Sequence, residues 1–309
     1  MLHALLIVLP LGLIMAIGWI VKRIGLVTDT GVAEMNGMLY WVSMPAILFR
    51  STIKVDPAHF SNFPFMCGVY GVFVVLPFIS WALARIRGLP REKLAVSVLV
   101  SIRGNNVFMG LPAVTIALGE PGLVSYGIYL ALSLVVYQMI SIAMGQLALS
   151  GELSIRSLFK TVRKLAGNPM LGACVLGVTG AFLGMGNLPG WLDQTLGILG
   201  NVGSGVALMA LGASLQIEHI LSSVRRVWND ILIRLFLSPL MTWGALTFME
   251  VDPMLTKTAV LVAAMPAAVN NFVLAQGMGM DGSYAGEVII TTTVFSILSL
   301  TLWISLLGV

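Results

Sequence analysis

Two stretches of this sequence place asparagine pairs and proline inside otherwise apolar segments. They read Ser101-Ile-Arg-Gly-Asn105-Asn106-Val-Phe-Met-Gly-Leu-Pro112 and Ala264-Met-Pro266-Ala-Ala-Val-Asn270-Asn271-Phe. Proline removes a backbone donor and clashes with the preceding turn, and glycine loosens the backbone, so each stretch predicts an interrupted helix. Half-helix N-termini present free N–H groups and a positive dipole end, which attract a carboxylate.

We therefore predict an anion site where these two helices cross. Its candidate residues share a place in one of the two stretches: Asn105, Asn106, Pro112, Pro266, Asn270, Asn271 and Arg103. The alternative is that the prolines only kink the helices and the asparagines bond to neighbouring backbone. Arg103 is the only basic residue that we place well inside an apolar segment, where a charge is expensive. Three roles are open for Arg103. It could bind a substrate carboxylate, pair with a protein carboxylate or backbone carbonyls, or extend toward the basic residues of 85–93.

A few other residues could hold or carry an ion. Glu287 could carry a coupling proton or lie at the membrane interface, and Asn201 is a second candidate for binding a coupling ion such as Na⁺. Uncoupled transport is the alternative. We expect no metal site and no cofactor, because the sequence has no Cys/His ligand spacing and only two cysteines, both in apolar runs.

The composition shows which elements must position these residues. The chain has 309 residues, of which 58% are apolar and 10% charged, and its mean hydropathy is +0.97. A soluble domain carries about 25% charged residues, so soluble enzymes and nucleic-acid binders are excluded and the chain is a polytopic membrane protein. Segments of about 20 apolar residues cross a bilayer as helices. We predict ten, at 2–21, 35–50, 62–85, 93–118, 123–148, 168–186, 192–215, 229–249, 256–278 and 285–307.

The basic residues predict the orientation of these helices. If the chain begins outside with a retained first span, thirteen Lys and Arg face the cytoplasm and only Arg50, Lys54 and Lys257 face outward. The thirteen are Lys22, Arg23, Arg85, Arg87, Arg91, Lys93, Arg156, Lys160, Arg163, Lys164, Arg225, Arg226 and Arg234. We expect an integral protein of a bacterial cytoplasmic (inner) membrane with both termini outside the cytoplasm.

The chain also contains an internal repeat. A basic cytoplasmic loop at 150–167 separates 1–149 from 168–309, and each half has five predicted helices. Pro77-x-x-x-Trp81 matches Pro239-x-x-x-Trp243, and the two asparagine pairs match at a similar offset. Because five is odd, the second half enters the membrane from the opposite side. Such an inverted repeat is typical of secondary transporters.

These motifs resemble the auxin efflux carrier family and its bacterial organic-acid or malonate permeases. The resembling stretches are Asn105-Asn106-Val-Phe-Met-Gly-Leu-Pro112, Val135-Val-Tyr-Gln138, Asn168-Pro169, Asn201-Val-Gly203 and Met265-Pro266-Ala-Ala-Val-Asn270-Asn271. The first is similar to the family's Asn-Thr-Leu-Val-Met-Gly-x-Pro. Asn106 stands where plant members have threonine and Asn201 where they have aspartate, which favours a small bacterial permease over an auxin carrier.

The resemblance implies a fold shared with bile-acid and sodium–proton antiporter relatives, in which helices 4 and 9 are interrupted and cross. Spans 1, 2, 6 and 7 would form a scaffold, and spans 3–5 and 8–10 a transport domain that moves as an elevator. The substrate would bind at the crossing, and Gln138 would line the same pocket. From the residues alone, Gln138 could equally bond to a neighbouring helix.

Our first hypothesis for function is a secondary transporter of small organic anions: carboxylates such as malonate, or auxin-like acids. The alternative is a cation/proton antiporter on the same fold, although such proteins need carboxylates in the membrane and neither interrupted helix contains Asp or Glu. We expect no enzyme activity, since no nucleophile–base arrangement is present. The expected partners are a carboxylate substrate and the bilayer, without nucleic acid, and a homodimer through the scaffold helices is an option.

Overall fold

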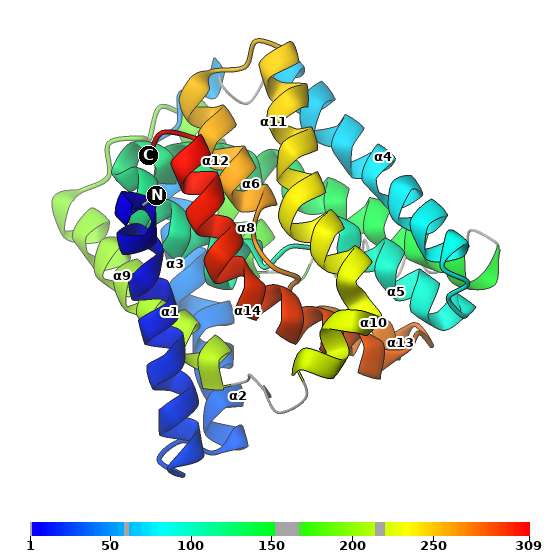
Figure 1. Ribbon diagram of the computed structural model, residues 1–309. Coiled ribbons are helices and arrows are strands. Elements are labelled where there is room, and N and C mark those ends of the chain that lie inside the picture. Colours follow the sequence, from blue (N-terminus) through cyan, green and yellow to red (C-terminus); the bar gives the residue numbers. More distant parts are fainter. Residues whose placement is uncertain (1, 59–61, 152–166, 168, 214–219) are drawn as a thin grey trace.

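The computed structural model describes residues 2–58, 62–151, 167, 169–213 and 220–309, and the regular elements in these ranges are helices (Figure 1). Most of the basic loop at 150–167 lies outside them. The labels η1, η3 and η4 mark single π-helical turns. The elements are α1 (Leu2–Arg23), α2 (Asp29–Met38), η1 (Leu39–Ser43), α3 (Met44–Ile53), α4 (Phe63–Ile86), α5 (Arg91–Ser101), η3 (Asn106–Gly110), α6 (Leu111–Ser150), α8 (Pro169–Phe182), α9 (Gly190–Ala213), α10 (Ile220–Leu232), η4 (Ile233–Leu237), α11 (Ser238–Phe248), α12 (Pro253–Ala263), α13 (Asn271–Gly277) and α14 (Gly282–Leu306).

Six helical stretches of the described residues are long and apolar enough to cross a membrane. They are Ala4–Arg23, Phe63–Ile86, Asn106–Ser150, Gly190–Ala213, Ser223–Phe248 and Gly282–Leu306. A spanning helix is required because the bilayer core offers no water to backbone N–H and C=O groups. The protein is therefore all-helical and built for a membrane, as its composition predicts.

Each of the ten predicted segments contains helix, but several boundaries differ. α2, η1 and α3 follow one another without a gap, so the second segment is longer than the predicted 35–50. The segment predicted at 229–249 already begins as helix at Ile220, and it takes Arg234 into its π-helical turn η4. Counting Arg234 as a residue of a cytoplasmic loop was therefore wrong.

The two segments predicted to be interrupted are both broken. α5 ends at Ser101 and helix resumes at η3, which leaves 102–105 non-helical; α12 ends at Ala263 and α13 begins after 264–270. Pro266 lies inside the second break. Pro112 does not lie inside the first, because it occupies the first turn of α6. A proline there removes no helical hydrogen bond, so the expectation that Pro112 helps to break this helix was wrong.

The two breaks lie against each other and pair through their backbones. Gly104 and Ala267 form an antiparallel bridge. The N–H of Asn105 donates to the carbonyl of Pro266 at 2.7 Å, and the N–H of Ala268 donates to the carbonyl of Arg103 at 3.0 Å. Buried backbone groups must find partners, and here each break supplies those partners to the other.

A second change of direction separates the fourth predicted segment from the fifth. α6 is a run of 40 residues, but Gly119 within it has φ 63° and ψ −153°. Glycine adopts positive φ without the steric cost that a Cβ brings, and Pro121 follows closely. The kink falls in the gap predicted between 118 and 123.

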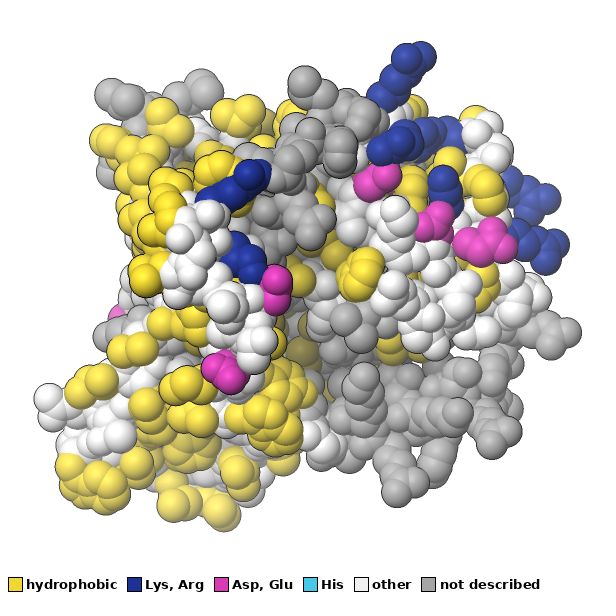
Figure 2. Space-filling model, turned by 90° about the horizontal axis from the view of Figure 1, so that it is seen from below, with side chains coloured by type: hydrophobic (Ala, Val, Ile, Leu, Met, Phe, Trp, Pro, Cys, Tyr) yellow, Lys and Arg dark blue, Asp and Glu magenta, His cyan; other side chains and the backbone are white. Residues whose placement is uncertain are grey.

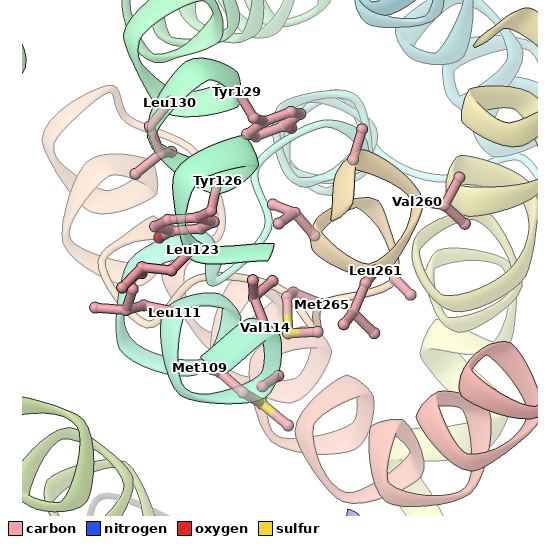
Figure 3. Close-up of a cluster of buried hydrophobic side chains, with 14 of the residues drawn as sticks. Met109, Leu111, Val114, Leu123, Tyr126, Tyr129, Leu130, Val260, Leu261 and Met265 are labelled. Carbon is pink, nitrogen blue, oxygen red and sulfur yellow. The ribbon is translucent and has the colours of Figure 1, made fainter. Parts of the chain in front are cut away.

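The helices pack in pairs that come from distant parts of the sequence. α1 packs against α9 and α3 against α8, while α12 packs against both α6 and α11. A large apolar cluster lies where η3, α6 and α12 meet (Figure 3). Its labelled members are Met109, Leu111, Val114, Leu123, Tyr126, Tyr129, Leu130, Val260, Leu261 and Met265. The Tyr126 hydroxyl in this cluster donates to the carbonyl of Asn106 at 2.7 Å and so fixes the start of η3.

Candidate functional site

A cavity of about 440 Å³ lies beside the paired breaks. Pockets for small molecules have volumes of about 300–1,000 Å³. One group of lining residues comes from the breaks, η3 and α6: Arg103, Gly104, Asn105, Asn106, Val107, Phe108, Leu134, Tyr137, Gln138, Ala268, Val269 and Asn270. The other group comes from α2, η1, α8 and α9: Asn36, Gly37, Tyr40, Met170, Ala207, Ala210 and Leu211.

Arg103 is the one charged residue among those that line the cavity. Its side chain is buried, with 4% of its surface exposed. Nε donates to Oδ1 of Asn271 at 2.8 Å, and Nη1 donates to Oε1 of Gln138 and to Oγ of Ser141. These partners are neutral, and no carboxylate of the described residues forms an ion pair with Arg103. The guanidinium is therefore oriented by amides and a hydroxyl while its charge stays uncompensated.

Neither of two asparagine amides at the cavity is satisfied. Asn105 and Asn106 are 2% and 3% exposed. Nδ2 of Asn105 and Oδ1 of Asn106 make no hydrogen bond to a described residue. A buried amide without a partner costs about 1–3 kcal/mol, so such groups mark places where a ligand or water supplies the missing bonds.

A helix also begins at the cavity. η3 starts at Asn106 and continues into α6, and Asn106, Val107 and Phe108 all line the cavity. The first N–H groups of a helix have no intrahelical acceptor and carry the positive end of its dipole. This end of the helix thus adds partial positive charge to that of Arg103.

Asn271 has a different role from Asn105. It is fully buried, does not line the cavity, and uses both ends of its amide. Oδ1 accepts from the Arg103 guanidinium, and Nδ2 donates to the Arg103 carbonyl at 3.1 Å. Asn271 therefore clamps the second break to the first and holds Arg103 in place.

Arg234 is a second buried arginine at the breaks, and it is 3% exposed. Its guanidinium donates to the carbonyls of Ser101, Ala263 and Met265 at 2.8–3.0 Å. Ser101 and Ala263 are the last residues of α5 and α12, where a helix leaves its last acceptors unpaired, and Met265 lies in the second break. A cation at a helix C-terminus is also favoured by the dipole, so Arg234 closes two helix ends at once.

The structure brings five of the predicted site residues to one cavity: Arg103, Asn105, Asn106, Gln138 and Asn270. Pro112 and Pro266 do not line it, although the Pro266 carbonyl holds Asn105. Glu287 lies elsewhere, in an ion pair with Arg226 at 2.9 Å. The side chain of Asn201 lies outside the described residues.

Sequence reasoning missed several residues here. Arg234 was assigned to a loop, because its position near Arg225 and Arg226 suggested a basic cytoplasmic cluster. Its separation from that cluster by the apolar run Ile231–Ile233 was the available signal. Tyr40 and Asn36 also line the cavity, but nothing in their local sequence distinguishes them from packing residues.

A helical membrane fold with a cavity at two paired helix breaks is typical of the class of membrane transport proteins. The comparison with family models assigns the chain more closely. The model described as membrane transport protein matches residues 3–304. The chain belongs to this family, which is the auxin efflux carrier family that the motifs resemble.

Relatives align along nearly the full chain. An "Uncharacterized transporter" of Methanothermobacter thermautotrophicus is 25% identical over 300 residues, which is 96% of each chain. A "Putative malonate transporter" of Rhizobium meliloti is 23% identical over 302 residues, 96% of this chain and 93% of the relative. "Auxin efflux carrier component 8" of Arabidopsis thaliana is 28% identical over 150 residues, 47% of this chain and 40% of the relative.

Proposed function

We propose that this protein is a secondary transporter of small organic anions, in which a carboxylate binds between Arg103 and the amides of Asn105 and Asn106. The observation that carries the proposal is the uncompensated charge of Arg103 beside the unpaired Nδ2 donor of Asn105, because a carboxylate accepts hydrogen bonds from both. An unpaired buried cation is strongly unfavourable, and an anionic ligand would neutralise it. The Rhizobium relative's name makes malonate the first dicarboxylate to test.

The mechanism we propose is an elevator built on two inverted repeats of five helices, 1–149 and 168–309. Support comes from the packing: α1 contacts α9 while α3 contacts α8, an exchange of partners expected when two repeats are related by an axis in the membrane plane. The cavity lies between residues of spans 2, 6 and 7 and residues of spans 4, 5 and 9. A movement of spans 3–5 and 8–10 past the scaffold would carry a ligand bound at the breaks.

We further propose that the basic face of the molecule is cytoplasmic. Figure 2 shows Lys and Arg side chains gathered on the face seen from below, with Asp and Glu side chains between them. The N and C labels lie away from the lower end of α1 (Figure 1), which agrees with both termini outside the cytoplasm. Positively charged loops remain on the cytoplasmic side during insertion.

A cation/proton antiporter is the competing function on this fold. It needs carboxylates that exchange ions at the site. Among the described residues, those that line the cavity include one arginine and no Asp or Glu, and a fixed positive charge repels a cation. Charge at the site therefore favours the organic anion.

A thermal-shift screen of the purified protein tests the proposal. The panel contains mono- and dicarboxylates, indole acids and amino acids, each with Na⁺ or K⁺ and at two pH values. A ligand of the native state stabilises it by about 2.7 kcal/mol at 100 times its Kd. We expect one class of acids to raise the melting temperature and Arg103→Gln to abolish that shift.

Arg226→Gln is the matched control, because it removes an arginine whose side chain is 52% exposed and paired with Glu287. It should keep the full response to the acid. Stabilisation by cations alone, in both the wild type and Arg103→Gln, would instead support the antiporter.

A further inference from the structure

A second polar cluster lies inside the helices that surround the breaks, outside the cavity. Its centre is Asp230 in α10, which is 2% exposed and is the one Asp or Glu among the described residues that is fully buried. No ion pair joins Asp230 to a described Lys or Arg. A buried ionised carboxylate without a cation is costly, so its environment requires an explanation.

The partners of Asp230 are neutral. The Tyr284 hydroxyl of α14 donates to Oδ2 at 2.6 Å. Ser97 of α5 lies beside the carboxyl group, but Oδ1 of Asp230 and Oγ of Ser97 each lack a hydrogen bond of good geometry to a described residue. One carboxyl oxygen and one nearby hydroxyl thus each lack a hydrogen bond within the described part of the chain.

A proton on the Asp230 carboxyl group would give both unpaired oxygen atoms a hydrogen bond. Protonated at Oδ1, the carboxyl donates to Oγ of Ser97 while Oδ2 still accepts from Tyr284, and no net charge remains buried. On deprotonation the O–H bond of the carboxyl breaks, the proton leaves to water, and the carboxylate needs a cation or water that its present neighbours do not supply.

The charged groups around this cluster already have other partners. Arg87, after α4, donates to Oδ1 of Asn229 and to the Arg226 carbonyl. Lys93 of α5 lies over the Tyr284 ring and 3.9 Å from Oδ2 of Asp281. From α10 and α14, Arg226 pairs with Glu287. The positive charge of Arg87 acts on the Asp230 carboxyl group, and a shift of its side chain toward Asp230 would compensate an ionised carboxylate.

The cluster around Asp230 lies one helical turn away from residues that contact the helix breaks. Arg234 follows Asp230 by one helical turn, and Ser101 follows Ser97 by one turn on α5, so the two pairs lie on neighbouring turns. Arg234 donates to the Ser101 carbonyl at 2.9 Å. A change of charge or position at Asp230 therefore acts on the arginine that holds the ends of both broken helices.

We propose that Asp230 is a proton-binding site that couples proton movement to transport through Arg234. The coupling role of Asp230 rests on the proposed transport function, whereas the proton site itself does not. A metal ion fits the cluster less well than a proton, because the described residues contain no group of three metal-binding side chains and the positive Arg87 is close by.

Infrared spectroscopy of the purified protein tests the proton site without any substrate. At mildly acidic pH the wild type should show the C=O stretch of a protonated carboxyl group, and Asp230→Asn should remove it. Glu92→Gln, which changes an exposed carboxylate on the neighbouring α5, should leave the band unchanged.

Tyr284→Phe keeps the carboxyl group but removes the hydroxyl that stabilises its ionised form, so the band should persist to higher pH. If Asp230→Asn fails to fold, Tyr284→Phe decides alone, and an unchanged band in it overturns the site.

Uptake of labelled malonate into proteoliposomes tests the coupling. We expect a pH gradient to increase the initial rate in the wild type at least several-fold and to have no effect in Asp230→Asn, which should still exchange malonate across the membrane. Gradient-dependent uptake that survives in Asp230→Asn, or that is lost in Glu287→Gln instead, overturns the coupling role. Absence of malonate uptake by the wild type counts against malonate as the substrate, while the infrared result still decides the proton site.

Discussion

The two buried arginines at the helix breaks, Arg103 and Arg234, have the same charge and nearly the same burial but opposite surroundings. Arg234 donates to the carbonyls at the ends of α5 and α12 and to the Met265 carbonyl in the second break. Arg103 donates to neutral side chains and faces the cavity. The first arginine meets the negative ends of two helices, whereas the second lies where a helix begins and partial positive charge already exists.

This difference in surroundings indicates that Arg234 stabilises the fold, whereas Arg103 is available to a ligand. A cation that donates hydrogen bonds to otherwise unpaired carbonyls stabilises the protein, because both partners would be unsatisfied without these bonds. A cation held near a positive helix end is destabilising until an anion arrives. The comparison therefore predicts that substitutions at the two arginines change stability by very different amounts.

The largest loss of stability should follow Arg234→Gln. Removing the guanidinium leaves three buried carbonyls without this donor, and each buried acceptor left without a partner costs about 1–3 kcal/mol. Thermal unfolding in detergent, followed by tryptophan fluorescence, measures the loss. Arg103→Gln in the same assay should unfold close to the wild-type temperature. Equal losses in the two variants would contradict the distinction between them.

Gly104→Ala should have the next largest effect on stability, because the added Cβ would disturb the surroundings of both Arg103 and Arg234. A Cβ at this position would overlap Nη2 of Arg234 and lie 2.6 Å from Oδ1 of Asn106. Overpacking of this kind costs about 1–3 kcal/mol. The melting temperature should fall, and the acid-induced shift should weaken because η3 is displaced. Gly71→Ala, where a Cβ meets nothing within 4 Å, is the control and should change neither.

Much of this comparison could be predicted from the sequence, because its signals are local. Proline, glycine and asparagine inside apolar runs located both breaks, and the isolated charge of Arg103 marked the cavity. Arg234 could not be assigned in the same way. It stands near the basic residues Arg225 and Arg226, and the short apolar run at 231–233 was the one sequence signal that it leaves their cluster.

The division of roles among the asparagines was also beyond the sequence. Asn270-Asn271 repeats Asn105-Asn106, so the pattern gives all four amides the same prediction. Their actual roles depend on which way each helix turns after its break, and this follows from contacts between residues more than 160 positions apart. Asp230 was overlooked for a similar reason: its Tyr284 partner lies on another helix.

Asn271→Ala and Asn105→Ala should separate a structural amide from a binding amide. Asn271 makes two hydrogen bonds to Arg103, so its loss should lower stability by about 1–3 kcal/mol. Asn105→Ala removes an amide whose Nδ2 has no hydrogen-bond partner in the part of the chain that the structure describes, and stability should change little while uptake of the acid is lost. Melting temperature and proteoliposome uptake are measured on both variants. Unchanged uptake in Asn105→Ala would contradict the site.

The smallest effect is expected at a third arginine, which has carboxylate partners in a more exposed place. Arg50 pairs with Asp193 at 2.9 Å and with Glu120 at 3.4 Å, and the Glu120 side chain is 60% exposed. An exposed ion pair contributes about 0–1 kcal/mol and is screened by salt. Glu120→Gln should therefore lower the melting temperature slightly at low salt and not at high salt, because Asp193 still holds Arg50. A salt-independent loss as large as that of Arg234→Gln would contradict the expectation that exposure weakens the Arg50–Glu120 contact.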